Sequence, residues 1–330
     1  MEIIYKQLFH CRIKFAKVNP VQQRRCGYQV RSLEPEHLTT YTLGEFQAPK
    51  LQFDGSKFET LHHNHPHEIE SCHYEHSIAM YDYVSAHQYN ETHRLVMLTD
   101  NFCVVMTSFQ HMTMTPFAGE CSSLGYRDGY GDEARFSRIY HSVRADDQQS
   151  VIIADHDNHK LRYLGLFSKR VSTFASLTKK PIGLVMRPES DELFFSFPGG
   201  LGRLNPLTPH LAEYLTSHDG YFGHSDGHLS AALFSDMPAT LLFISTNVML
   251  VSDYNNDVLR AVDTEKSTVT TLCTRGEPAM GGKSIKRCAL KNPQSLLHKE
   301  TADGKQQVLI GMSGAIGYLN YYGELSHKSR

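Results

Sequence analysis

The chain has 330 residues, 33 Lys and Arg against 35 Asp and Glu, a formal net charge of -2, and 40% hydrophobic residues. This length and hydrophobic content are sufficient for one large domain or two ordinary ones with a buried core, so a disordered chain is not expected. A nearly neutral chain has no long-range field that would attract a phosphate backbone or an anionic membrane surface, which argues against generic nucleic-acid binding.

The start of the chain shows no secretory signal, because charged residues interrupt 1–15 and leave no continuous apolar core. The longest apolar run, 239–251, is broken by Ser245, Thr246 and Asn247 and is shorter than the roughly 20 residues that a membrane-spanning helix needs. We therefore expect no membrane span, and either a cytoplasmic protein or a mature or truncated piece.

A histidine-rich segment lies at 62–76, with Glu and Cys interleaved among its six histidines. The histidines are His62, His63, His65, His67, His73 and His76. Imidazole and carboxylate groups suit zinc or copper. However, no helical His-Glu-x-x-His motif is present and Pro66 indicates an irregular loop, so a solvated insertion is the first interpretation. The alternatives for this segment are a metal site and a change of charge between pH 5 and 7. For the chain as a whole no cofactor is predicted, and zinc or calcium is the alternative.

Further along, Asn90 begins an Asn-Glu-Thr glycosylation sequon. Seven Cys without a Cys-x-x-Cys pair argue against a cysteine zinc site. Two pairs are close enough in sequence to form disulfides, Cys103 with Cys121 and Cys273 with Cys288, and free buried thiols are an equal alternative. These features favour an extracellular or secretory-pathway protein, with the cytoplasm as the alternative.

An internal repeat dominates the middle of the chain. The segment from Gly125 aligns without a gap with the segment from Gly223, at a constant offset of 98 residues. The recurring positions are Asp128, Gly129, Ala134, Phe136, Asp155, Asn158, Leu161, Arg162, Val171 and Thr173, matched by Asp226, Gly227, Ala232, Phe234, Asp253, Asn256, Leu259, Arg260, Val269 and Thr271. This offset suits two units of about 49 residues each.

Each unit predicts a small antiparallel sheet. Continuous apolar runs at 151–154 and 249–252 are typical of strands buried on both faces. Turn-forming residues follow each run, and a half-polar, β-branched strand at 171–174 or 269–272 ends the unit as an exposed outer edge. No segment has sustained helical spacing of apolar residues.

Such sheets cannot bury their faces alone, so the repeat predicts an all-β fold, a β-propeller of six blades with four antiparallel strands each, and irregular N-terminal and His-rich insertions. Strong blades are expected at about 124–176 and 223–275, weaker ones at about 74–120, 179–217 and 288–325, a partial one at about 24–44, and an extension or closing strand at 1–23. The segment 28–43 either supplies strands to the last blade or forms a sixth one.

The recurring positions resemble the signature of the NHL repeat family of β-propellers: Asp-Gly, Ala-x-Phe, an apolar strand ending in Asp, Asn three positions later, an apolar-Arg pair and a Val-x-Thr strand. The resemblance covers two full blades. It implies a rigid scaffold that presents loops. Among the proteins that this pattern resembles, the lyase half of peptidylglycine-amidating enzymes uses His-bound zinc on the channel axis, and TRIM-type propellers bind RNA through a basic face.

The doubled polar residues are interpreted as structural. Asp155, Asn158 and Arg162 could in principle do acid–base work, but a catalytic group is needed once, whereas a structural cap is needed in every blade. We expect each Asp to accept bonds from backbone N–H groups of its own turn and to pair with the Arg on the next strand.

The predicted function is therefore a non-catalytic propeller that binds another protein or a small ligand through the loops of one face. No Gly-x-Ser-x-Gly nucleophile motif is present, and no catalytic residue is assigned. A metal-dependent lyase or hydrolase with its site in the central channel is the alternative. RNA binding is a further alternative, although the basic residues form scattered pairs and no aromatic-interleaved stripe, so nucleic acid is not an expected partner.

Overall fold

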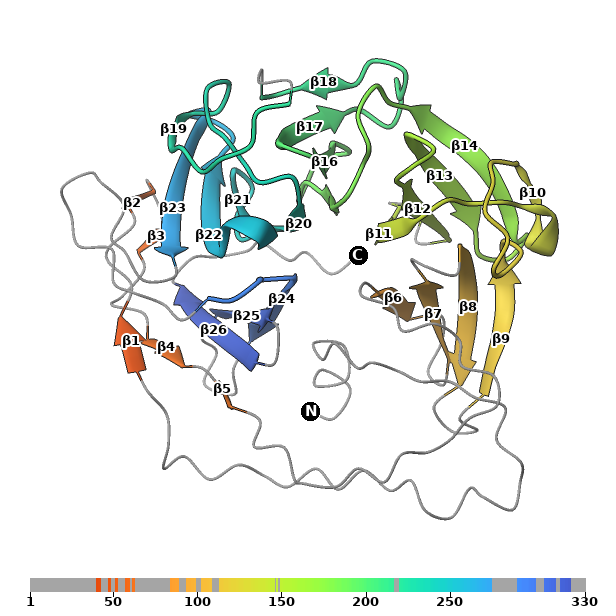
Figure 1. Cartoon of the computed structure of the whole chain (residues 1–330), viewed down its shortest axis with the longest axis horizontal. Coiled ribbons are helices and arrows are strands. Elements are labelled where there is room, and N and C mark those ends of the chain that lie inside the picture. Colours follow the sequence, from red (N-terminus) through yellow and green to blue (C-terminus); the bar gives the residue numbers. More distant parts are fainter. Residues whose placement is uncertain are drawn as a thin grey trace, which may run out of the picture.

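The structure is a computed structural model. It describes residues 40–42, 47–48, 51–52, 57–59, 61–62, 84–88, 93–98, 102–108, 113–145, 147, 149–216, 220–274, 290–300, 306–312 and 315–321. These residues form antiparallel strands and short 3-10 turns, and their larger sheets stand around a common centre (Figure 1). The chain is a β-propeller, as the repeat predicts. In the part that the structure describes, no helix has the length and hydropathy needed to cross a membrane.

Five sheets of four or five strands are numbered here along the chain. Sheet 1 holds β6 (Val84–Gln88), β7 (His93–Leu98), β8 (Cys103–Ser108) and β9 (Thr113–Ala118). Sheet 2 holds β10 (Gly129–Tyr130), β11 (Ile139–Arg144), β12 (Ser150–Asp155), β13 (Lys160–Gly165) and β14 (Arg170–Ser176). Sheet 3 holds β15 (Leu184–Met186), β16 (Leu193–Phe197), β17 (Gly200–Leu204) and β18 (Glu213–Tyr214). Sheet 4 holds β19 (Gly227–His228), β20 (Pro238–Phe243), β21 (Val248–Asp253), β22 (Val258–Asp263) and β23 (Thr268–Thr274).

Sheet 5 joins strands from distant parts of the sequence. It holds β24 (Ser295–Glu300), β25 (Gln306–Met312), β26 (Ala315–Tyr321) and β5 (Leu61–His62). In this sheet β5 pairs antiparallel with β26, with Leu61 opposite Ile316. Two further sheets have two strands each: β1 (Thr40–Thr42) with β4 (Lys57–Glu59), and β2 (Gln47–Ala48) with β3 (Leu51–Gln52). Residues 1–39 lie outside the described part, and the count of six blades stays a prediction.

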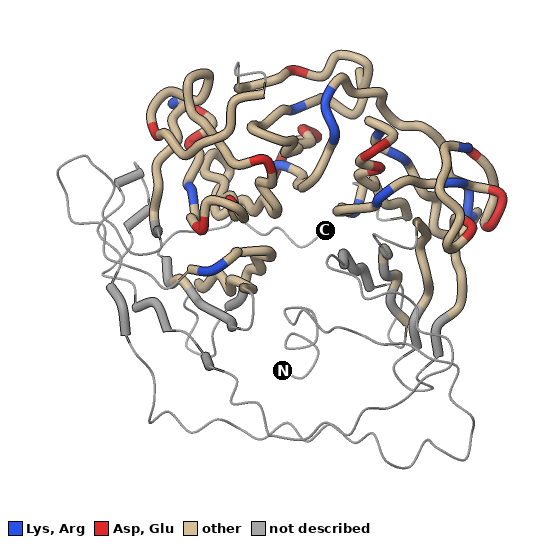
Figure 2. Tube along the Cα trace, in the orientation of Figure 1, with Lys and Arg blue, Asp and Glu red and all other residues tan. Residues whose placement is uncertain are grey.

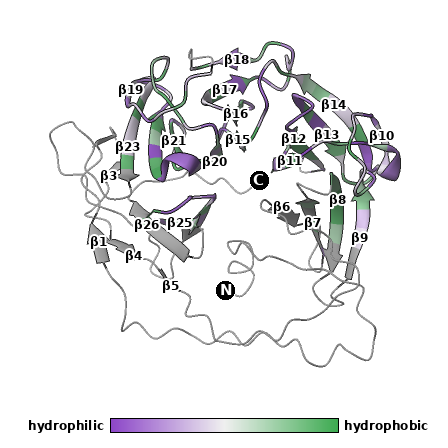
Figure 3. Ribbon diagram, viewed as in Figure 1, coloured by the Kyte–Doolittle hydropathy of each residue, from purple (hydrophilic) through white to green (hydrophobic). Residues whose placement is uncertain are grey.

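The second strand of each strong repeat is buried throughout, as its continuous apolar run predicts. Every residue of β12 and of β21 is buried (Figure 3 shows the hydropathy of the strands). Alternate side chains of β12 enter different cores: Val151 and Ile153 pack against sheet 1, whereas Ile152 and Ala154 pack against sheet 3. A strand between two neighbouring sheets therefore has no polar face, and its sequence loses the usual alternation.

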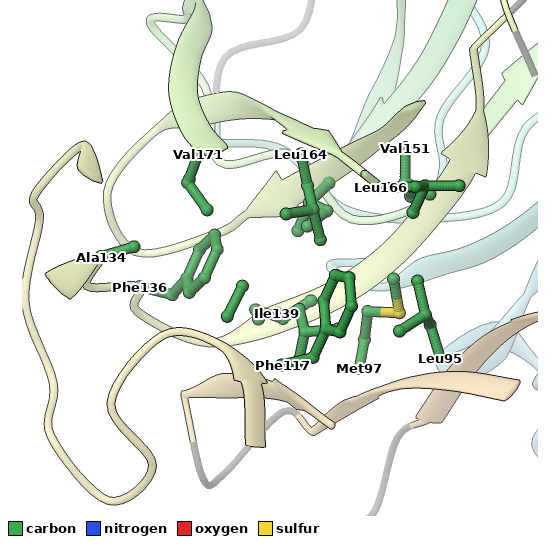
Figure 4. Close-up of a cluster of buried hydrophobic side chains, with 13 residues drawn as sticks. Leu95, Met97, Phe117, Ala134, Phe136, Ile139, Val151, Leu164, Leu166 and Val171 are labelled. Atoms are coloured by element: carbon green, nitrogen blue, oxygen red, sulfur yellow. The ribbon is translucent and has the colours of Figure 1, made fainter. Parts of the chain in front are cut away.

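The cores lie between successive sheets. In the first core, Leu95 and Met97 of β7 and Phe117 of β9 meet Phe136 and Ile139 of the next unit (Figure 4). All five side chains are at most 3% exposed. Burying one such side chain contributes about 1.5–3 kcal/mol, so each junction between sheets stabilises both of them.

The outer edge of the two strong repeats differs from expectation. The strand at 171–174 was expected to be an exposed edge, but β10 pairs with β14, with Gly129 opposite Val171. In sheet 4, β19 covers β23 in the same way, with Gly227 opposite Val269. Sheets 2 and 4 thus have a fifth, short strand, because the chain that enters each repeat runs along its outer side before it reaches the innermost strand.

Candidate functional site

The connection that enters sheet 2, residues 119–138, is called the first excursion. One side chain of β13, Arg162, binds this excursion both near residue 128 and near residue 135. Arg162 is completely buried and its Nη1 donates to Asp155 Oδ2 at 2.8 Å and to the carbonyl of Arg135 at 3.0 Å. Its Nη2 donates to Asp128 Oδ1 at 2.7 Å and to the carbonyl of Arg127 at 2.9 Å. The guanidinium therefore binds three acceptors of the excursion and one of the sheet, and so ties the excursion to the sheet.

Asp155, at the end of β12, gathers donors from three parts of the chain. Besides Arg162, its Oδ1 accepts from Ser137 N at 2.7 Å and from Ser137 Oγ at 2.5 Å. Its Oδ2 also accepts from Asn158 Nδ2 at 2.9 Å, and that amide reaches the carbonyl of Gly125 at 2.8 Å. The backbone N–H that binds Asp155 thus comes from the excursion and not from the turn after β12, which corrects the expectation above. From that turn the side-chain amide of Asn158 reaches Asp155, whereas Ser137 binds the carboxylate through both its N–H and its hydroxyl.

Asp128 fixes the other end of the same group, called the first clamp (Asp128, Asp155, Asn158 and Arg162). Its Oδ2 accepts from Thr173 N at 3.0 Å, and its Oδ1 accepts from Thr173 Oγ1 at 3.1 Å. Desolvation raises the pKa of Asp128, but the bond from Thr173 N and the bond and charge of Arg162 outweigh it, so the net pKa lies below its ordinary value. The carboxylate is thus ionised at neutral pH and joins the excursion to β14.

The second clamp (Asp226, Asp253, Asn256 and Arg260) repeats this pattern in sheet 4. Arg260 Nη1 donates to Asp253 Oδ2 at 3.4 Å and to the carbonyl of Leu233 at 2.9 Å. Its Nη2 donates to Asp226 Oδ1 at 2.9 Å and to the carbonyl of Ser225 at 2.8 Å. Every partner lies 98 residues after its counterpart, so the same geometry holds the connection that enters sheet 4, called the second excursion (220–237).

The carboxylates of the second clamp have the same partners. Asp253 accepts from Ser235 N at 2.9 Å and from Asn256 Nδ2 at 2.7 Å, and Asp226 accepts from Thr271 N at 2.8 Å. The ion pair to Asp253 is longer than that to Asp155, and burial raises the pKa of Asp253. The buried ion pair of the second clamp is therefore the weaker of the two, whereas its bond from Thr271 N to Asp226, at 2.8 Å, is shorter than the matching bond in the first clamp, at 3.0 Å.

Aromatic rings and glycines complete the clamps. Arg162 Cζ lies 5.1 Å from the ring centroid of Phe136, and Arg260 Cζ lies 5.0 Å from that of Phe234. Glycine is required for different reasons at Gly129 and at Gly227, the two matching positions of the repeat. A Cβ at Gly129 would meet Glu133 Cβ at 2.9 Å, whereas Gly227 adopts a φ of +126° that other residues rarely adopt.

The two fully buried carboxylates of the clamps have little capacity for chemistry on a substrate. The side chains of Asp155 and Asp253 are 0% exposed, and each is bonded by an arginine, an asparagine and a backbone N–H. An acid–base group must reach the proton that it transfers, to within about 2.6–3.2 Å or through one water. These carboxylates instead hold the excursions in place.

The structure places the remaining candidates apart from the clamps. Cys103 and Cys121 form a disulfide that ties the start of β8 to the first excursion. Cys273 lies in β23 and His62 in β5, whereas Cys288, Asn90 and the other five histidines of 62–76 lie outside the described residues. Among the residues that the structure describes, no three His, Cys, Asp or Glu gather as metal ligands would.

Sequence reasoning missed the exposed hydrophobic side chains of the connections. They are Leu124, Tyr126, Tyr130, Phe167, Leu207, Leu211, Tyr221 and Phe222, each more than 50% exposed. A signal was available, because apolar residues in turn-rich segments between strands have no core position to fill. Such side chains are typical of contact surfaces when they gather on one side of a scaffold.

Two groups of exposed hydrophobic side chains lie on opposite faces of the propeller. The chain passes from sheet to sheet on one side, called the connection face, where Tyr221 and Phe222 lie close to Gly199 at the turn between β16 and β17. The turns between the third and fourth strands lie on the other side, called the hairpin face, and carry Phe167 and Leu207. The first excursion places Leu124 beside Phe136, at the position that Phe222 has in the second.

Comparisons with known proteins bear on the fold. No protein-family model matches the chain, and no curated protein matches its sequence. An auxiliary nutrient binding protein from Bacteroides ovatus is similar in structure, with 10% identity and a TM-score of 0.55 over 72% of this chain. The match spans 59% of that protein, which is less than two thirds of its length.

Two further solved structures are less similar. An auxiliary nutrient binding protein from Bacteroides thetaiotaomicron has 11% identity and a TM-score of 0.45, covering 73% of this chain and 69% of its own. Virginiamycin B lyase from Staphylococcus aureus has 10% identity and a TM-score of 0.42, covering 72% and 69%. At such identities the likeness concerns the fold alone.

Proposed function

We propose that the chain is a non-catalytic, NHL-type propeller of six blades that binds another protein or a small ligand through loops of its connection face. One observation carries this proposal: the polar residues that recur in register are consumed in holding the two excursions, while the excursions expose large apolar side chains. A rigid scaffold that presents loops is the usual arrangement for binding.

The binding surface that we propose consists of Leu124 and Tyr126 in the first excursion and Tyr221 and Phe222 in the second. The repeat relates Leu124 to Phe222, so these two side chains hold equivalent places in the two excursions. Tyr126 is also anchored, since its hydroxyl lies 2.8 Å from Thr173 Oγ1 and its ring centroid lies 5.1 Å from Arg162 Cζ. A ring held in this way loses little conformational entropy on binding.

Other observations support the setting of this function. A nutrient-binding protein of similar fold agrees with ligand binding, and the disulfide agrees with an extracellular or secretory compartment. Basic and acidic residues occur together on the described sheets (Figure 2), which favours a protein or small ligand over RNA. Glycosylation at Asn90 belongs to the same proposal.

Binding can be tested by thermal shift, since a ligand at 100 times its Kd stabilises the folded state by about 2.7 kcal/mol. Peptides, sugars and other soluble nutrients are screened against the purified chain, and any hit is repeated on the Tyr221→Ser/Phe222→Ser variant. The matched control is Phe167→Ser/Leu207→Ser on the hairpin face, where the side chains are at least as exposed.

The proposal predicts a shift that the first variant loses and the control keeps. A hit that only the control variant loses would place binding on the hairpin face and contradict the proposal. Zinc or calcium that stays stoichiometric after dialysis, together with turnover of an ester or peptidyl substrate, would overturn it in favour of the metal-dependent enzyme.

A further inference from the structure

One position of the repeat reaches across to the next sheet in both copies. At the turn after β12, the Nδ1 of His156 lies 2.9 Å from the carbonyl of Pro181, in the connection to β15. At the matching place in sheet 4, the hydroxyl of Tyr254 lies 3.5 Å from Nε2 of Gln294, just before β24. The contact is thus repeated, but only the first copy uses a side chain that titrates near neutral pH.

The surroundings of His156 favour the neutral imidazole over the doubly protonated, charged form. Its ring packs edge-on against Tyr140 of β11, with centroids 4.5 Å apart. The charged groups that face it are Asp157 on its own turn, Lys180 from the connection to sheet 3, and Arg138 before β11. Burial is the main cause that lowers the pKa of His156, Lys180 and Arg138 lower it further, and the Pro181 carbonyl and Asp157 oppose them.

A second histidine at the same junction also needs to be neutral. The Nδ1 of His141 in β11 accepts from the backbone N–H of Leu184 in β15 at 3.3 Å. An amide N–H only donates, so this nitrogen must be unprotonated for the bond to exist. A carbonyl only accepts, so His156 carries its proton on Nδ1 and leaves Nε2 as the site for the second one.

We infer that the junction between sheets 2 and 3 is a pH-sensitive seam, which loosens at mildly acidic pH when His156 and His141 become protonated. Protonation of His141 removes the acceptor of the Leu184 N–H. Protonation of His156 adds a positive charge to a half-buried place where Lys180 and Arg138 outnumber Asp157.

The sign follows from linkage. Because the pKa of His156 is lower in the closed junction than in the open one, the open junction binds more protons. The stability that the neutral ring contributes is therefore complete above the ordinary histidine pKa of about 6.5 and is lost as the pH falls from there through the lowered value. Loosening stays local, since the apolar core of this junction does not titrate.

Amide hydrogen exchange on the intact chain tests the seam. The reporter is the Leu184 N–H, and the matched reporter is the Asn292 N–H, which crosses from sheet 5 to Asp257 at 2.6 Å. After correction for intrinsic exchange rates, we expect the protection of Leu184 to fall several-fold between pH 7.5 and pH 5, and that of Asn292 to stay constant. Equal falls at both amides, or no fall at Leu184, would overturn the inference.

The variant His156→Tyr/His141→Asn places the residue of the second copy at position 156 and keeps an acceptor for Leu184. It should abolish the pH-dependent fall, and a fall that persists in it would contradict the role of the two histidines. If this variant does not fold, histidine NMR of the wild-type chain still decides. His156 should titrate below about 6.5, and titration at or above that value would contradict the inference of a pH-sensitive junction.

Discussion

Arg162 and Asp155 form a completely buried ion pair, with Nη1 of the arginine 2.8 Å from Oδ2 of the aspartate. Neither charge meets solvent, so each depends on the other and on the hydrogen bonds around them. The pair joins β13 to the end of β12 and, through Ser137 and the carbonyls of the excursion, to the chain that enters the sheet. These two side chains thus connect β12, β13 and the excursion of the same unit.

Replacing the arginine should destabilise the fold strongly. In Arg162→Leu the buried carboxylate of Asp155 loses its cation and two excursion carbonyls lose their donor, so we expect a loss of about 3–5 kcal/mol. Urea unfolding followed by circular dichroism measures it. The exposed Arg170, on the neighbouring strand, provides the control Arg170→Leu, for which a change within about 0.5 kcal/mol is expected. Similar losses in both variants would argue against the clamp.

The disulfide should contribute through the unfolded chain. Cys103 and Cys121 are separated by 18 residues, and a closed loop of about this size is associated with roughly 3 kcal/mol. We expect Cys103→Ala/Cys121→Ala to lower the free energy of unfolding by that order. Wild-type protein in excess reductant is the control and should show a similar loss. A reductant-insensitive midpoint would mean that the bridge does not stabilise the fold.

Gly202 in β17 should not tolerate a side chain. A Cβ there would lie 2.3 Å from Cζ of Phe195, within the core between sheets 2 and 3. We expect Gly202→Ala to destabilise the protein by about 1–3 kcal/mol, as overpacking does. At Gly223 the nearest atom is the flexible Cδ1 of Leu233 at 3.2 Å, so Gly223→Ala should lower the Tm less. The reverse order would contradict the packing described here.

Acid should weaken the first clamp through Asp128. Its folded pKa is lowered from the model-compound value of 3.8, so the stability it contributes is present above that value and is lost as the pH falls through the folded pKa. In Asp128→Asn this part of the pH dependence should disappear. The urea midpoint of both proteins, measured from pH 5 to pH 2, tests this. Parallel curves would show that Asp128 does not stabilise the fold by its charge.

The fold could be predicted from the sequence because its signal is repeated. The doubled apolar runs and the constant offset indicate stacked sheets, and the burial of Ile152 and Ile153 toward opposite neighbours explains why β12 lacks alternation. The fifth strand could not be predicted in the same way. Gly129–Tyr130 is too short to give a period, and its place beside Val171 depends on the path of the whole excursion.

The roles of the polar residues were only partly accessible. Pairing between Asp155 and Arg162 follows from their places on adjacent strands, since Ile153 lies opposite Arg162 in the register. The donor Ser137 lies 18 residues before Asp155, and no local rule joins a connection to a carboxylate at that distance. The exposure of Tyr221 and Phe222 was not predicted, because in the sequence an apolar pair in a loop looks the same as the end of a buried strand.

The central claim is that the doubled polar residues maintain the architecture, and a pair of double-mutant cycles tests it most directly. The cycles combine Arg162→Met with Asp155→Leu and Arg260→Met with Asp253→Leu, and unfolding free energies give the coupling in each. We predict favourable coupling of about 0.5–3 kcal/mol in both, larger in the first clamp, where the ions are 2.8 Å rather than 3.4 Å apart. Coupling near zero in both cycles, with stability retained in every variant, would contradict the account.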